Sequence, residues 1–339
     1  MQTQPINSAQ VKESMSTTQA WRSVLQRIIG VPSERHRLAT AMAVTPMTLS
    51  RWANDNSTPG KTQLIHLVQS VRAEDRMELI EALGQNYNDI YHWLHDEIAE
   101  QIPTDFFSQV LNTRATVIDS LRFWQMSEMI LKQTLAQLDT NGLGMSITLV
   151  QCMPPSREGK IRSLRERVGR GTPPWPADLQ HLSAFLGMES LAGYVVQSRR
   201  PASIEDLNKD HLLPAYQTEY EVSAAAHPIW LEGRIAGCLL ASSTQTGYFS
   251  QQRMSLLGTF TDIISLAFNK EDFYSPDLID LRMMPHAPQQ RPYLASFRQK
   301  VTQAIIKAGQ NHRHIDNFEA ERIVWQELEE LLLSLQSVD

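Results

Sequence analysis

Apolar residues recur at three- and four-residue intervals through the first 85 residues of the chain. This spacing is typical of amphipathic helices. Gly30 and the pair Pro59-Gly60 interrupt it, because neither residue type readily continues a helix. The pattern predicts helices over about 18–29, 32–42, 46–54, 61–71 and 73–83, preceded by a polar arm over residues 1–16.

The segment from Ala43 to Asn54 combines a tight turn with a short helix. Thr45 suits the N-cap, and Pro46 suits the first helical position, where the missing N–H costs nothing. Leu49 and Trp52 share one face, which would be buried. The opposite face has no carboxylate and carries Met47, Thr48, Ser50, Arg51 and Asn54. Such a face suits a DNA major groove, because Arg bridges guanine and Asn bridges adenine. The alternative is a helix that only packs its Trp into a core.

The next segments are also helical. A polar-aromatic connector is predicted over 86–101, and one long helix from about Thr104 to Leu138. The apolar stripe of the long helix exceeds what one small sheet would cover. Part of it is therefore expected to meet a partner helix.

From residue 145 the period changes to that of strands. Strands are predicted over 145–153, 163–168, 222–230 and 234–241, the last two joined by the turn Leu231-Glu232-Gly233. Ile161, Leu164 and Val168 would also fit a helical face. The segment 169–176 is too rich in Gly and Pro for regular structure, and helices are predicted over 179–185 and 250–268.

The C-terminal part begins with a proline-rich break over 272–292, followed by predicted helices over 296–308 and 317–335. Phe318, Trp325 and Leu332 are spaced by seven, with Leu328 and Leu335 between them. This is typical of a coiled-coil seam. The alternative is that the last helix docks onto its own domain.

Charge is distributed unevenly along a chain whose net charge is −6. Residues 17–72 contain seven basic and two acidic side chains, whereas residues 318–339 contain six acidic side chains and one basic one. The positive charge surrounds the segment 43–54, as the electrostatic part of DNA binding requires. No apolar run approaches a membrane span and no secretion signal is evident, so we expect a cytoplasmic protein without a membrane partner.

The helical block over 17–85 resembles the lambda-repressor-like (Xre-type) helix-turn-helix domain. The matching residues run from Leu38 to Leu67, and TLSRWANDNSTPG (48–60) is the most specific part. The resemblance implies that Pro46, Met47, Ser50 and Arg51 contact bases or phosphates. Members of that family usually carry a polar residue in place of Pro46, so one base-reading hydrogen bond is expected to be missing.

Three later stretches resemble the GAF domain. They are LAGYVVQSRRPASIEDL (191–207), HPIWLEGRIAGCLLASS (227–243) and GYFSQQRMSLLGTFTDIISLAF (247–268). The resemblance covers about residues 105–269. It implies an antiparallel sheet with helices on both sides and a pocket for a ligand or partner, but no particular ligand or cofactor.

Candidate ligand-binding residues are Trp175, Tyr194 and His227, each of which would otherwise be an ordinary core residue. Four arginines, Arg162, Arg165, Arg167 and Arg170, cluster where the rim of the pocket is expected. They would suit an anionic ligand, a solvated strand face or a second DNA contact.

No catalytic or metal-binding motif is found, so an enzyme is not expected. Some GAF proteins reduce free methionine sulfoxide with cysteines. The two cysteines here, Cys152 and Cys238, lie in apolar strands and are expected to be core residues.

The sequence therefore predicts a multidomain protein. An all-α helix-turn-helix domain (17–85) is followed by a connector and dimerisation helix (86–138), an α+β GAF-like domain (139–270) and a helical tail (271–339). The predicted function is a homodimeric, sequence-specific regulator of transcription that binds double-stranded DNA and senses a small-molecule effector or a partner. The alternatives are a DNA-tethered adaptor that recruits another protein, and a GAF-type thiol reductase.

Overall fold

The computed structural model divides the chain into two compact units, each described here by itself. It describes residues 20–87, 89–95, 101–179, 184–210 and 219–336. The first unit comprises residues 1–99 together with 139–143, and the second comprises 100–138 and 144–339. The predicted arm over 1–16 and part of the connector lie outside the described residues. No described helix is both long enough and apolar enough to cross a membrane.

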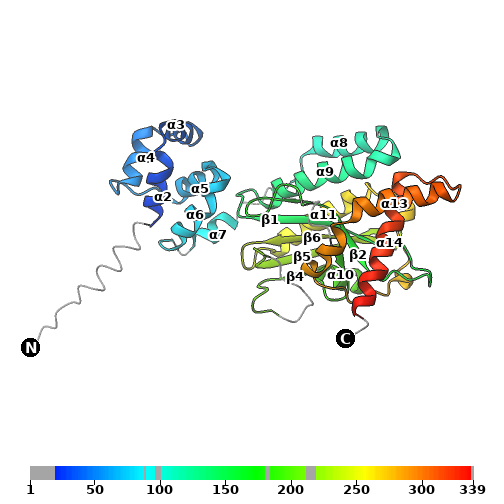
Figure 1. Ribbon diagram of the computed structural model, residues 1–339. Helices are drawn as coiled ribbons and strands as arrows, with labels where there is room; N and C mark the ends of the chain where they lie inside the picture. Colours follow the sequence, from blue (N-terminus) through cyan, green and yellow to red (C-terminus); the bar gives the residue numbers. More distant parts are fainter. Residues whose placement is uncertain (1–19, 88, 96–100, 180–183, 211–218, 337–339) are drawn as a thin grey trace, which may run out of the picture. The chain divides into compact units, whose positions relative to one another are not determined.

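Helices alone build the described part of the first unit (Figure 1). They are α2 (Ala20–Ile29), α3 (Pro32–Ala41), α4 (Pro46–Ala53), α5 (Lys61–Ser70), α6 (Ala73–Gly84) and α7 (Ile90–His95). Their apolar stripes are buried, with Leu25, Leu38 and Leu49 fully enclosed. The five helices predicted before residue 85 are therefore confirmed, close to their predicted boundaries.

An antiparallel sheet of six described strands lies at the centre of the second unit. The strands are β1 (Met145–Cys152), β2 (Leu164–Gly171), β3 (Phe185–Leu186), β4 (Ala202–Ile204), β5 (Ser223–Leu231) and β6 (Arg234–Ser243). Their order across the sheet is β3-β2-β1-β6-β5-β4, and every neighbouring pair is antiparallel. The predicted antiparallel sheet is confirmed.

The hairpin between β5 and β6 turns where the sequence predicts. Leu231 pairs with Arg234 across a two-residue turn of Glu232 and Gly233. Both turn residues have positive φ, 52° and 74°. Such turns follow the natural twist of the flanking strands.

Different helices cover the two faces of the sheet (Figure 1). On one face lie α9 (Asp119–Leu138) and α11 (Gln251–Ser265), and on the other lies α10 (Leu191–Ser198). Because side chains alternate along a strand, Ala224 and Ala226 of β5 face α10. Their neighbour His227 faces Gly258 of α11.

The prediction of one long helix over 104–138 is wrong. α8 (Thr104–Thr116) ends at Val117, which is extended with φ −82° and ψ 133°, and α9 begins at Asp119. Three consecutive β-branched residues, 116–118, weaken the helix here, and Asp119 favours a new N-terminus. α8 packs against α9.

Two predictions between β1 and α10 also fail. β2 continues to Gly171, inside the segment predicted as a loop, and the helical alternative for 161–168 is wrong. Gly169 admits close packing, because a Cβ there would lie 3.0 Å from the Cβ of Leu179. The predicted helix over 179–185 is not formed at Leu179 or Phe185, and residues 180–183 lie outside the described part.

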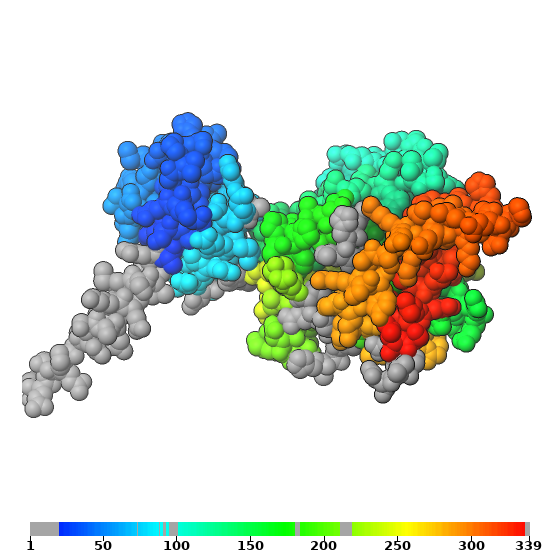
Figure 2. Space-filling view, in the orientation of Figure 1, coloured from blue at the N-terminus to red at the C-terminus, as the bar shows by residue number. Residues whose placement is uncertain are grey.

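The C-terminal helices lie on the surface of the second unit (Figure 2). They are α12 (Ala287–Leu294), α13 (Phe297–Gln310) and α14 (Asn317–Gln336), preceded by short 3₁₀ turns at Lys270–Asp272 and Pro276–Leu278. α12 begins inside the predicted break. Pro288 is tolerated there because it lies in the first turn, where backbone N–H groups have no intrahelical acceptor.

The apolar seam of α14 is largely used within the chain. The rings of Trp325 and Phe297 stack with centroids 4.1 Å apart, and Leu328 and Leu332 are buried. Phe318, at the start of the helix, is 71% exposed. The docking alternative therefore holds for the middle of α14, where no continuous coiled-coil seam is left free.

Candidate nucleic-acid interface and ligand cavity

Local geometry fixes the turn from α3 into α4. Ala43 takes a left-handed φ of 51°, and the Val44 N–H donates to the Ala39 carbonyl at 3.0 Å. The Thr48 N–H donates to Thr45 Oγ1 at 3.2 Å, which confirms the predicted N-cap. Leu49 and Trp52 are buried on the inner face of α4. The orientation predicted for this helix is thus confirmed.

The outer face of α4 carries the predicted DNA-contacting side chains. Met47, Arg51 and Asn54 are exposed, and Pro46, Thr48 and Ser50 are half-buried. The hydroxyls of Thr48 and Ser50 serve the first turn of the helix: Thr48 Oγ1 lies 2.9 Å from Thr45 Oγ1, and Ser50 Oγ donates to the Pro46 carbonyl at 3.1 Å. Met47, at 69% exposure, and Arg51 are therefore the side chains most available to a partner.

Ion pairs offset much of the positive charge counted from the sequence. Arg22 lies 2.6 Å from Asp55, and Arg27 lies 2.9 Å from Asp75 of α6. Arg51 forms no ion pair within the described residues. The charge that α4 offers to DNA therefore resides mainly in Arg51.

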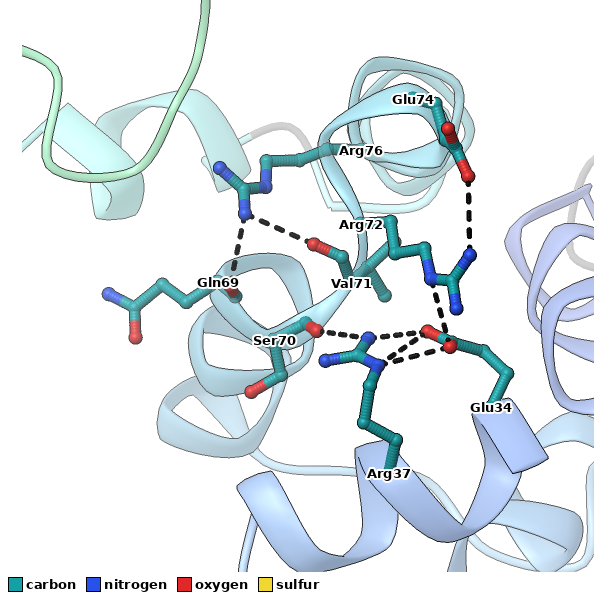
Figure 3. A network of polar contacts seen from close by, with 8 residues as sticks. All are labelled: Glu34, Arg37, Gln69, Ser70, Val71, Arg72, Glu74 and Arg76. Atoms are coloured by element: carbon teal, nitrogen blue, oxygen red, sulfur yellow. Dashed lines mark hydrogen bonds and ion pairs between the residues drawn. The ribbon is translucent and has the colours of Figure 1, made fainter.

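A buried carboxylate ties α3 to the turn between α5 and α6 (Figure 3). Glu34 accepts hydrogen bonds from Arg37 Nε at 2.9 and 3.0 Å, and Arg72 Nε lies 3.0 Å from it. Hydrogen bonding from Arg37 and the charges of both arginines hold the pKa of Glu34 below its usual value. Arg37 also donates to the Ser70 carbonyl at 2.8 Å. This network fixes the position of α3. Because only a short turn joins α3 to α4, it also restricts the position of α4.

Residues 139–143 are held inside the first unit by polar contacts. Gln69 Nε2 donates to Asn141 Oδ1 at 2.8 Å, and Asn141 Nδ2 donates to the Leu94 carbonyl. Arg76 donates to the Asn141 carbonyl at 3.3 Å and to the Gln69 carbonyl at 3.1 Å. The segment is therefore anchored by side chains of α5 and α6.

A cavity of about 660 Å³ lies in the second unit, on the sheet face that α10 covers. This volume falls within the usual range for small-molecule sites. Its floor includes four strand residues with small or hydroxyl side chains, namely Ser146, Thr148, Ala224 and Ser242, together with the larger Leu240. Apolar walls come from Trp175, Leu179 and Leu191. The cavity can therefore enclose an organic molecule with an apolar body.

One of the three predicted ligand-binding residues, Trp175, lines this cavity. Tyr194 and His227 do not line this cavity. Tyr194 lies on α10 but packs against the apolar core beyond the cavity. His227 faces α11 on the opposite side of the sheet, where burial lowers its pKa. Side chains of β5 alternate between the two faces of the sheet. Because Ala224 and Ala226 face α10, His227 faces the opposite side, away from the cavity.

Carboxylates line the cavity, and sequence reasoning missed all of them. They are Glu166, Glu189, Glu219 and Glu221. Glu166 is half-buried on β2 and accepts the Ala184 N–H at 3.0 Å. Burial, and then the neighbouring charge of Glu221, raise its pKa to about 8. The available signal was the alternation of β2, which places Glu166 on the same face as the buried Leu164.

The arginine cluster does not rim the cavity. Arg165 lies over the ring of Trp325 at 4.0 Å, and Arg167 over that of Phe123 at 4.5 Å. Arg162 lies 3.7 Å from Glu330, and Arg170 pairs with Glu128. These arginines bind α9 and α14 to the sheet, and none of the four lines the cavity.

Both cysteines are free and buried. Burial raises the pKa of Cys152 to about 12 and also raises the pKa of Cys238. Because the thiolate is the nucleophilic form, neither thiol is activated in this structure.

Comparison with known families identifies the central part of the chain. The model of the GAF domain matches residues 131–269, so this part of the chain is a GAF domain. No family match covers the N-terminal helices. A comparison with the curated proteins gives no match.

Solved structures with low similarity include several GAF proteins. The GAF domain of Acinetobacter phosphoenolpyruvate-protein phosphotransferase is 17% identical, covers 48% of this chain and 90% of its own, and has a TM-score of 0.34. The type II free methionine-R-sulfoxide reductase of Thermoplasma acidophilum is 12% identical, with coverages of 41% and 93% and a TM-score of 0.30. The GAF-B domain of DevS from Mycobacterium smegmatis is 15% identical, with coverages of 44% and 92% and a TM-score of 0.28. Scores this low support no inference about ligand or activity.

Proposed function

We propose that this chain is a sequence-specific, DNA-binding regulator of transcription that acts in the cytoplasm and whose GAF domain senses a small molecule. The observation that carries the proposal is the outer face of α4. Met47 and Arg51 project from a helix that is capped by Thr45 and anchored by Leu49 and Trp52. This arrangement suits a recognition helix, which needs a rigid inner face and free side chains able to reach base edges.

The sensing part of the proposal is supported by the cavity. A sheet floor and apolar walls enclose a volume suited to a small molecule, within a domain whose fold commonly holds sensory ligands. Both cysteines lie buried in strands, which favours sensing over thiol-based reduction.

Binding as a homodimer completes the proposal. One helix-turn-helix buries little surface, and two copies acting together on an inverted repeat give tight, specific binding. Apolar side chains lie exposed along α8, α9 and the two residues between them, namely Phe107, Leu111, Ile118, Leu121 and Trp124. These residues, termed the α8–α9 patch, offer a surface for a second copy.

The test is selection of bound DNA from random-sequence duplexes, followed by anisotropy titration with the enriched duplex. Arg51→Ala should weaken binding by about 1–3 kcal/mol, the usual contribution of a base-reading arginine. Arg298→Ala removes the same charge from an exposed position on α13 and should leave affinity unchanged. Wild-type affinity should also fall steeply with salt. Failure to enrich any duplex, or equal affinity of the Arg51 variant and wild type, would refute the proposal.

A further inference from the structure

Carboxyl groups are the most numerous ionisable groups on the lining of the GAF cavity. Glu166 comes from β2 and Glu221 from the residues before β5, and the two charges interact. Exposed Arg291 and His286 line only the outer part. No ion pair joins Glu166 to a basic side chain in the part of the chain that the structure describes. Burial without a cationic partner raises the pKa of Glu166 to about 8 and keeps it protonated below that pH, and a positively charged ligand would favour its ionised form.

Hydrogen bonds hold these carboxylates in place for a ligand. Ser242 Oγ donates to Glu221 Oε1, and Ser242 pairs across the sheet with Ser146 on the cavity floor. The Ala184 N–H holds Oε2 of Glu166. The acidic end of the cavity is thus built from β2 and from a residue just before β5 that a side chain of β6 holds in place.

An aromatic and aliphatic wall completes the cavity. The rings of Trp175 and Tyr220 meet edge to face with centroids 6.1 Å apart, and Leu179 lies on the same lining. Aromatic faces attract organic cations as well as apolar groups. This wall favours a ligand with an apolar body rather than a bare ion.

We propose that the GAF cavity binds an organic cation, a protonated amine with an apolar body, whose ammonium group lies at Glu166 and Glu221. The body would pack against Trp175 and Leu179. A metal ion is a poorer occupant, because no three His, Cys, Asp or Glu side chains among the described residues are placed to hold one. An anion would be repelled by the charge of Glu221. This inference rests on the proposed sensing function of the GAF domain.

The experiment compares three probes that share a phenylethyl or phenylpropyl body, using the full chain and isothermal titration. The probes are 2-phenylethylamine (cationic), 2-phenylethanol (neutral) and 3-phenylpropionate (anionic). The amine should bind at least tenfold more tightly than either of the others. Glu166→Gln keeps an acceptor for the Ala184 N–H, and it should weaken amine binding at least tenfold while leaving the alcohol unaffected.

Two further variants serve as a second test and as a control. Glu221→Gln should also weaken amine binding, and it provides a second measurement should Glu166→Gln fold poorly. Glu205→Gln removes an exposed carboxylate that does not line the cavity, and should bind the amine as wild type does. Preference for the anion, binding of none of the three probes at millimolar concentration, or unchanged amine affinity in both cavity variants would overturn the inference.

The DNA titration of Arg51→Ala separates this inference from the proposed function. Specific DNA binding with an anion-preferring cavity would refute only the ligand class. Amine binding by a chain that enriches no duplex would refute the regulator and leave the ligand class standing.

Discussion

Glu166 keeps a proton in the folded protein under conditions where the unfolded chain releases it. Its folded-state pKa is about 8, raised first by burial, whereas an unfolded glutamate titrates near 4.3. Between roughly pH 4.5 and 8 the folded state therefore binds more protons than the unfolded state, and the free energy of unfolding falls as pH rises. Glu329, whose pKa burial also raises, acts in the same direction.

Glu166→Gln should remove the contribution of this one group. Relative to wild type, the variant should gain at least about 1.4 kcal/mol of stability between pH 5 and pH 9, the value of one pKa unit. Urea unfolding at both pH values measures this difference, and contributions such as that of Glu329 cancel between the two proteins. Glu205→Gln serves as the control for loss of a carboxylate. Parallel pH profiles for wild type and Glu166→Gln would contradict the assignment.

Residue roles were predictable where they follow from local periodicity. The buried and exposed faces of α4 follow from the spacing of Leu49 and Trp52 alone. The contents of the cavity depend instead on register, because neighbouring residues of one strand face opposite sides of the sheet. Strand register placed His227 against α11 and Glu166 in the cavity, and no single segment of sequence reveals both.

Among the elements, α4 is short and depends on its cap. Its eight residues, Pro46–Ala53, make few intrahelical hydrogen bonds, so the bond from the Thr48 N–H to Thr45 Oγ1 matters. Thr45→Ala should lower the free energy of unfolding by about 1 kcal/mol, and Thr45→Ser should restore it by keeping the acceptor. Melting temperatures of the two variants, measured by circular dichroism, test this expectation. Equal melting temperatures for the Ala and Ser variants would show that the cap contributes nothing.

Other elements were predictable only in part, for physical reasons. Helical spacing continues through residues 104–138, so periodicity gives no sign of the break at Val117. The break becomes favourable because α8 folds back: the ring of Phe106 lies 6.3 Å from that of Phe260 on α11. Similarly, the glycines of β2 indicate a loop until the tight packing of Leu179 against Gly169 is known. In both places tertiary contacts outweigh local propensity.

For the whole molecule, the α8–α9 patch predicts self-association. Leu111 and Leu121 are 62% and 49% exposed, a large apolar exposure for a free surface. Replacing both with Lys should convert a dimer into a monomer without loss of fold, and should weaken binding to an inverted-repeat duplex. Multi-angle light scattering at micromolar concentration measures the mass. Replacing Ile306, an apolar residue 54% exposed on α13, with Lys is the matched control. A monomeric wild-type protein would contradict the prediction.

Coupling between ligand binding in the GAF domain and DNA binding by α4 is a property of the whole molecule. Because α8 and α9 are separate helices, no continuous helix over 104–138 can carry a signal from the sheet. Residues 139–143 provide another covalent route, because they follow α9, precede β1 and are held by Gln69 and Arg76. Ser146 and Thr148, a few residues further along, line the cavity. A ligand that shifts β1 would therefore pull on a segment anchored beside α5 and α6.

Asn141→Ala should uncouple the two activities while preserving each. In wild type, saturating 2-phenylethylamine should change affinity for the selected duplex by about 5- to 150-fold, and the duplex must change amine affinity by the same factor. In the variant both factors should approach one. A ligand changes DNA affinity only if it binds two arrangements of the protein with different affinity, and without the Asn141 side chain the first unit would no longer distinguish those arrangements. Replacing Gln101–Thr104 with a Gly/Ser segment is the contrasting variant, and it should retain coupling. If Asn141→Ala kept full coupling, the signal would not pass through residues 139–143. The same would follow if only the Gly/Ser variant lost coupling. Absence of coupling in wild type would mean that the GAF domain serves only in dimerisation.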